Sequence, residues 1–105
     1  MTIDEQARTT IEDLGLDRTE LLIGAKAIAQ EIIEESKSTD RPLQGMVYDV
    51  WGLYNDGTPK CSFATNKDGD LVFTAQFHTD ENDVHEVKRR AISPDTLKQL
   101  CNPHG

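Results

Sequence analysis

The stretch LQGMVYDVWGLY, residues 43–54, decides between two architectures for this chain. Large apolar side chains recur in it at helical spacing, at Leu43, Met46, Val47, Val50, Trp51 and Tyr54. Its β-branched and aromatic content, with Gly52 in the middle, favours a strand instead. We predict a helix over residues 43–54, packed on the preceding helix with Trp51 buried. A strand in this place would instead extend the sheet that follows.

The residues before this stretch are predicted to be helical. Over residues 19–35 an apolar stripe alternates with a polar side, which is the pattern of an amphipathic helix packed on a core. The stripe consists of Leu21, Leu22, Ala25, Ile28, Ala29, Ile32 and Ile33. A shorter helix is predicted over residues 2–14, because Thr2 and Glu5 form a capping-box pattern. Residues 36–42 are expected to form a loop.

The residues after it are predicted to form strands. The expected strands cover residues 60–65, 71–78 and 84–92, and the second alternates strictly between apolar and polar side chains. Residues 66–70, Asn-Lys-Asp-Gly-Asp, make a strong turn signal between the first two.

A short helix closes the chain in this interpretation. Ser93 is suited to cap a helix over residues 95–101, with Pro94 at its first position. We therefore predict one α+β domain over residues 1–105. It has two or three N-terminal helices, then an antiparallel β-hairpin or three-stranded meander, then the short C-terminal helix.

Length and composition place the chain among ordinary small folded proteins. It has 105 residues, of which 36% are hydrophobic and 29% charged, so it is too apolar to be disordered. No apolar run approaches the roughly 18 residues of a membrane span. The N-terminus lacks the apolar segment of a secretion signal, and two cysteines are too few for a disulfide framework. We expect a soluble, cytoplasmic protein that does not associate with membranes.

The formal net charge is −8, and the acidic residues concentrate in the first half. Residues 1–40 contain ten acidic and four basic residues, a net −6. Such a domain does not attract nucleic acid through its overall field. A DNA-binding function therefore requires the basic residues of the second half to share one face.

Three segments carry a resemblance to a known family. They are the helix beginning ELLIGAKAIAQEI at residues 20–32, the pair Val47-Tyr48, and Gly57-Thr58-Pro59. Together they resemble, over residues 20–75, small winged helix-turn-helix proteins of the excisionase-like and phage-regulator kind. The connection over residues 34–41 is longer than the tight turn of that family. The resemblance implies a winged-helix-like fold and a small DNA-binding regulator, with a homodimer as a further expectation.

In this hypothesis the DNA contacts come from polar and basic side chains of the second half. They are Gln44, Lys60, Lys67, Lys88, Arg89 and Arg90. Gln44 would lie on the outward side of the recognition helix, where glutamine can bind adenine edges. The basic residues would contact phosphates from the wing. Alternation along a strand would send Arg89 to one side and its two neighbours to the other. The same charges could instead protect an exposed strand edge from pairing.

The sequence contains no recognisable catalytic or metal-binding motif. Symmetric strand pairing would bring the imidazoles of His78 and His85 face to face, but no established ligand spacing surrounds them. Cys61 and Cys101 are expected to be structural thiols, since neither has a base at a defined spacing. We expect no enzymatic activity, no cofactor and no metal.

A second hypothesis belongs to a different functional class. The protein could be an acidic protein-interaction or inhibitor module, which could imitate nucleic acid. Residues 46–54 would then form a strand, the sheet would have four members, and the acidic helical face around Glu31 and Glu34 would contact a protein partner. The conformation of residues 43–54 distinguishes the two hypotheses.

Overall fold

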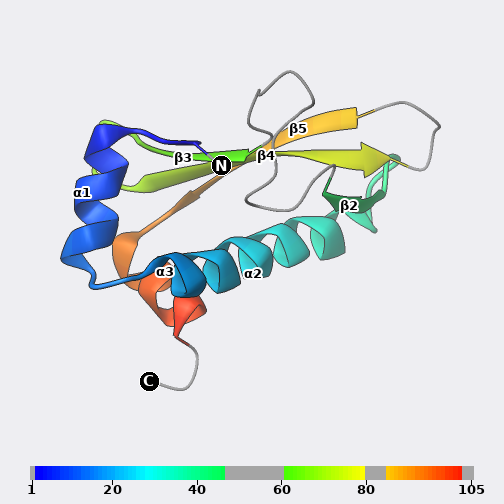
Figure 1. The fold of residues 1–105 in the computed structure, drawn as a ribbon. Helices are drawn as coiled ribbons and strands as arrows, with labels where there is room; N and C mark the ends of the chain where they lie inside the picture. The colour runs from blue at the N-terminus through cyan, green and yellow to red at the C-terminus, as the bar shows by residue number, and fades with distance from the viewer. Residues whose placement is uncertain (1, 47–60, 80–84, 103–105) are drawn as a thin grey trace.

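The computed structural model describes residues 2–46, 61–79 and 85–102, and its architecture is α+β as predicted (Figure 1). The elements are β1 (Thr2–Ile3), α1 (Glu5–Asp13), α2 (Arg18–Ser36), β2 (Leu43–Met46), β3 (Cys61–Thr65), β4 (Leu71–Thr79), β5 (His85–Ile92) and α3 (Pro94–Cys101). Two N-terminal helices precede an antiparallel sheet, and a short helix follows it. No helix in the described ranges is long and apolar enough to cross a membrane.

The long helix α2 forms where the amphipathic pattern predicted it. Its start is fixed by a capping box, in which the Asp17 carboxylate accepts a hydrogen bond from the Glu20 N–H at 2.8 Å. The Glu20 side chain accepts one in return from the Asp17 N–H at 3.3 Å. At the other end, the buried Ser36 hydroxyl donates to the Ile33 carbonyl at 2.6 Å and accepts from the Leu43 N–H at 2.8 Å. Ser36 therefore joins α2 directly to the start of β2.

The predicted start of the first helix is wrong by three residues. The cap is Asp4, whose carboxylate accepts a hydrogen bond from the Ala7 N–H at 2.8 Å, and not Thr2. Thr2 and Ile3 are extended because they pair in parallel with Ser62 and Phe63 of β3. Pairing in the sheet satisfies backbone groups that the capping box would otherwise have used.

The sheet is organised around β4. One edge of β4 pairs antiparallel with β5 over Leu71–His78. β3 pairs antiparallel with Leu71–Ala75, and β2 with Phe77–Thr79. β5 occupies one edge of β4 along both Leu71–Ala75 and Phe77–His78. Because a strand has only two edges, β3 and β2 must both pair with the other edge of β4, where they lie end to end. The two-residue β1 extends the sheet beyond β3.

The predicted helix over residues 43–54 is wrong for its first four residues, which form β2. Leu43 is opposite Thr79 and Met46 is opposite Phe77, with a register shift between Leu43 and Gly45. Pairing with β4 thus overrides a helical spacing that is real in the sequence. Residues 47–54, including Trp51, lie outside the described residues. The sheet has four antiparallel strands besides the two-residue β1. The strand that the second hypothesis placed over residues 46–54 shares only Met46 with β2, and its other residues lie outside the described residues.

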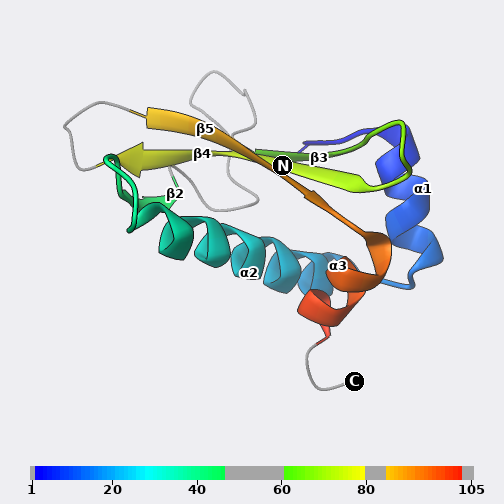
Figure 2. The ribbon, with the colours of Figure 1, turned by 180° about the vertical axis from the view of Figure 1, so that it is seen from behind.

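The core lies between one side of the sheet and the helices α2 and α3 (Figure 2). Alternate residues of β4 supply it, namely Leu71, Phe73, Ala75 and Phe77, as their period predicted. We call this the helix side of the sheet and the opposite surface the open side.

The helices α2 and α3 approach closely at Gly24. A Cβ atom at this position would overlap the Sγ atom of Cys101 on α3. Glycine is therefore needed here for the close approach of two helices and not for a turn. The Cys101 thiol is buried, as predicted, and burial raises its pKa to about 11.

Candidate functional site

The basic run of β5 is divided between the two sides of the sheet. The register places Glu86, Lys88 and Arg90 opposite Phe77, Ala75 and Phe73, and hence on the helix side. Arg89 is opposite Thr74 on the open side. The alternation predicted from the sequence is confirmed, so Lys88, Arg89 and Arg90 do not form a single patch.

The two bases on the helix side are engaged in ion pairs within the fold. The Arg90 guanidinium contacts Glu31 of α2 at 3.8 Å and also contacts Glu35. Lys88 contacts Glu86 at 3.3 Å, and Arg41 contacts the same carboxylate at 3.4 Å. Local carboxylates therefore neutralise much of the charge that a phosphate contact would use.

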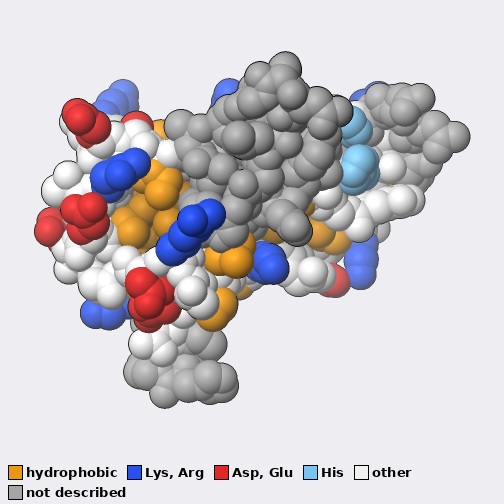
Figure 3. All heavy atoms as spheres, viewed as in Figure 1, with side chains coloured by type: hydrophobic (Ala, Val, Ile, Leu, Met, Phe, Trp, Pro, Cys, Tyr) orange, Lys and Arg blue, Asp and Glu red, His pale blue; other side chains and the backbone are white. Residues whose placement is uncertain are grey.

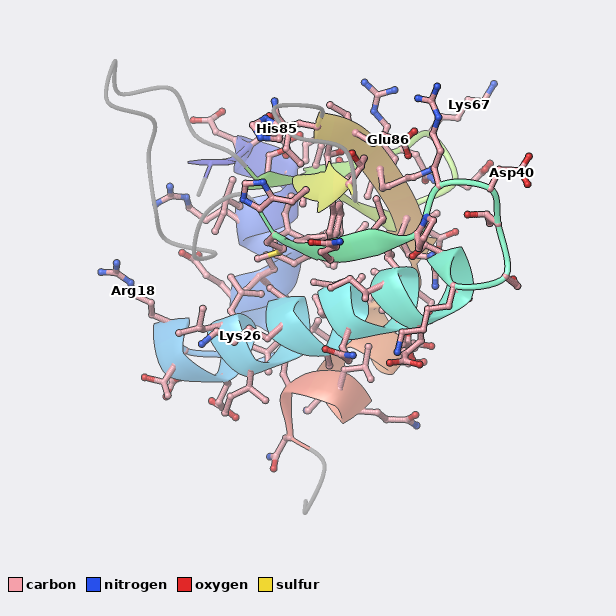
Figure 4. The ribbon with its side chains drawn as sticks, turned by 90° about the vertical axis from the view of Figure 1, so that its right-hand side faces the viewer. Arg18, Lys26, Asp40, Lys67, His85 and Glu86 are labelled. Carbon is pink, nitrogen blue, oxygen red and sulfur yellow. The ribbon has the colours of Figure 1, made fainter. Side chains whose placement is uncertain are left out.

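The other proposed DNA contacts are far apart. Gln44 is exposed at the irregular part of β2, beside the last residues of β4. Lys67 is exposed in the turn before β4 (Figure 4). The length of β4 separates them by about 25 Å at the rise of a β-strand. Lys60 lies outside the described residues. The structure does not bring Gln44, Lys67 and the bases of β5 onto one surface.

Three glutamates gather on the C-terminal half of α2. Glu31, Glu34 and Glu35, which we call the acidic face, are exposed. Together with Ala27 and Gln30 they line a wide hollow of about 540 Å³. The last turn of α2 contains no basic residue, so these carboxylates lie near the negative end of the helix dipole without compensation from the helix itself.

Lys37, the cap residue that follows α2, supplies part of the missing compensation. Its ammonium donates a hydrogen bond to Glu34 at 2.9 Å, and this contact lowers the pKa of the Glu34 carboxyl. Arg90 pairs with Glu31 and Glu35, so the three carboxylates of the acidic face and the two bases that contact them carry a net charge of −1.

The open side of the sheet has the opposite electrostatic character. Its described positions on β3, β4 and β5 are Ser62, Ala64, Val72, Thr74, Gln76, His78, His85, Val87, Arg89 and Ala91. None of these is acidic, although the whole chain carries a net charge of −8. Arg89 is the only arginine or lysine among them. An anionic ligand would meet no carboxylate at these positions.

The facing imidazoles expected from the sequence are present on the open side. His78 and His85 are direct partners in the register, with ring centroids 4.9 Å apart and planes at 79°. They are the two pale-blue side chains in Figure 3. Within the described residues, no group of three or more His, Cys, Asp and Glu side chains is placed to hold a metal ion. The side chain of Cys61 is not described.

A narrow groove of about 200 Å³ runs beside β5. Its lining residues are Ile32, Glu35, Ser36, Thr39, Lys88, Arg89 and Arg90. Ile32 and Ser36 are buried on α2, and Lys88 and Arg90 lie on the helix side of the sheet, so the groove lies between the end of α2 and β5. The sequence did not predict this groove, because it depends on how closely the end of α2 approaches β5.

Comparisons with known proteins found no counterpart: no protein-family model, no curated protein and no solved structure matches the chain.

Proposed function

We propose that this protein is a protein-interaction module whose acidic face on α2 binds a basic segment of a partner protein. The observation that carries the proposal is the clustering of Glu31, Glu34 and Glu35 around a surface hollow at the negative end of the α2 dipole. A cationic side chain placed there would gain from the carboxylates and from the helix terminus together.

Two further features support a protein partner over DNA for this surface. The bases nearest to the acidic face, Arg90 and Lys37, are already held by Glu31, Glu35 and Glu34. The hollow is also lined by the apolar residue Ala27, so a partner side chain with an aliphatic stem and a charged end would fit it. Lysine and arginine have that form.

A second candidate function is nucleic-acid binding through the open side. It is favoured by the absence of acidic side chains from the described positions of that surface, and by Arg89 lying on it. Phosphate contacts there would not meet the repulsion expected from a chain of net charge −8. This candidate uses one of the six residues that the sequence proposed as DNA contacts, Arg89.

One pair of charge reversals separates the two functions. The Glu31→Lys/Glu34→Lys variant should bind a partner poorly if the acidic face is the site. Its matched control is Glu5→Lys/Glu12→Lys, which makes the same change of charge on exposed positions of α1. Peptides would be selected from an unbiased random library on the wild-type protein, and their affinities measured for all three proteins.

The selected peptides are expected to contain lysine or arginine and to lose about tenfold or more in affinity for the α2 variant only. Selected peptides without basic residues, or equal losses in both variants, would rule out the acidic face as the site. For labelled double-stranded DNA at low salt the second candidate predicts the opposite sign. The α2 variant should then bind DNA as well as the wild type or better, because it only removes repulsion.

A further inference from the structure

We propose that β5 pairs with β5 of a second copy of this chain, so that the two sheets join edge to edge in a two-fold dimer. This association is independent of the acidic face and of the open side. It follows from the edge of β5 with which no described strand pairs, from the pattern of charges along it, and from Val87.

The edge of β5 is regular and available. Eight consecutive residues, His85–Ile92, pair in unbroken register with β4 on one side. Among the described residues, no strand pairs with the other edge. β5 has no proline, glycine or bulge. Every second backbone amide and carbonyl group therefore points outward and can bond to another strand. The charged side chains of β5 are a further device that prevents edge pairing, unless opposite charges meet across the new pair.

A strand added to β5 would lie in the plane of the sheet, at the usual separation of about 4.8 Å between strands. The groove lined by Ile32, Ser36, Lys88 and Arg90 lies on the helix side of this plane, so an added strand would lie beside it and not in it.

The charges on β5 select a second copy as the occupant. In an antiparallel two-fold pair, the residue at the centre lies opposite its own copy, and both helix sides fall on the same side of the joined sheet. A centre at any charged residue would set like charges against each other. A centre at Val87 sets Glu86 opposite Lys88 of the second copy, and Lys88 opposite Glu86, and it sets no like formal charges opposite each other between His85 and Arg89.

Val87 itself supports the same centre. Its side chain is 52% exposed, the most exposed of the large hydrophobic residues in the described part of the chain. At the two-fold axis, the Val87 side chain would contact Val87 of the second copy on the open side of the joined sheet. The positions from His85 to Arg89 therefore combine one apolar contact with two ion pairs and the backbone hydrogen bonds of the new strand pair.

The experiment is a charge exchange followed by sedimentation equilibrium, at concentrations from about 10 µM to about 1 mM, which cover weak specific association. Wild type should be dimeric at the upper end. Glu86→Lys and Lys88→Glu should each weaken dimerisation about tenfold or more, because each sets like charges opposite each other. An equimolar mixture of the two variants should form a heterodimer, in which the opposite charges meet again. The double exchange Glu86→Lys/Lys88→Glu should restore the homodimer.

Glu12→Lys is the matched control for Glu86→Lys, and Lys98→Glu is the matched control for Lys88→Glu. Each makes the same change of charge at an exposed helix position away from β5. Both should dimerise as the wild type does. A wild type that stays monomeric throughout overturns the proposal. So does a dimer that survives both single reversals, a mixture that remains monomeric, or a control that dissociates. In a second measurement, outward amides of β5 should exchange with solvent more slowly as the protein concentration rises.

Discussion

Successive residues of β5 belong to two surfaces with different physical properties. Glu86, Lys88 and Arg90 lie on the helix side, where they form ion pairs with one another, with α2 and with Arg41. His85, Val87 and Arg89 lie on the open side, whose described positions carry no acidic residue. The comparison shows that a run of charges in a strand is divided by its period of two. Neighbours in the sequence can therefore have unrelated roles.

The largest expected difference between the two sides concerns packing. Phe73 is fully buried on the helix side, whereas its neighbour Thr74 is partly exposed on the open side. Phe73→Ala should lower the free energy of unfolding by about 3–5 kcal/mol, through lost contacts and a cavity. Thr74→Ala should change it by less than about 0.5 kcal/mol. Urea unfolding measures both. Similar losses would mean that the open side is packed as tightly as the helix side.

A smaller effect is expected within the helix layer. Gly24→Ala should lower the free energy of unfolding by about 1 kcal/mol, because overlap with Cys101 outweighs the gain in helix propensity. Ala27→Gly, on the outer side of α2, should also lose about 1 kcal/mol, here from propensity alone.

Thermal or urea unfolding would measure the free energy of unfolding of both variants. Both Gly24→Ala and Ala27→Gly are expected to be less stable than the wild type. Adding Cys101→Ala should remove the penalty of Gly24→Ala, since no Sγ atom then occupies the space. A Gly24→Ala variant more stable than the wild type would show that α3 moves aside without cost.

The smallest effect separates two adjacent arginines. Arg90→Ala breaks contacts with Glu31 and Glu35, and should lower the free energy of unfolding by about 0.5–1 kcal/mol at low salt. The loss should shrink in about 1 M salt, because screening weakens partly exposed pairs. Arg89→Ala should have no measurable effect at either ionic strength. Unfolding curves at both salt concentrations provide the test, and equal losses for the two variants would contradict the division of β5.

Local signals in the sequence were sufficient for most of the fold. The stripe of α2, the alternation of β4, the turn at residues 66–70 and the Ser93-Pro94 cap of α3 each depend on neighbours in the chain. The helix prediction failed at residues 43–46 because their conformation is set by pairing with β4, which follows some thirty residues later in the chain. Helical spacing and strand propensity were both present there, and only tertiary pairing decided between them.

The candidate surfaces were predictable in part. The acidic face was visible as the polar side of α2, and the facing histidines followed from the hairpin symmetry. The ion pairs of Arg90 with α2 were not predictable, because they require the relative placement of a helix and a strand more than fifty residues apart. The groove beside β5 was missed for the same reason.

The interrupted edge of β4 has a consequence for changes in the length of this protein. The chain leaves that edge at Met46, opposite Phe77, and rejoins it at Cys61, opposite Ala75, so only Gln76 separates the two attachment points along β4. The ends of the intervening fourteen residues, 47–60, are therefore anchored close together by the sheet itself. The entropic cost of holding two chain ends at fixed positions grows only slowly with the number of residues between them. A change in the length of the chain between Met46 and Cys61 is therefore expected to leave the registers of β2 and β3 on β4 unchanged.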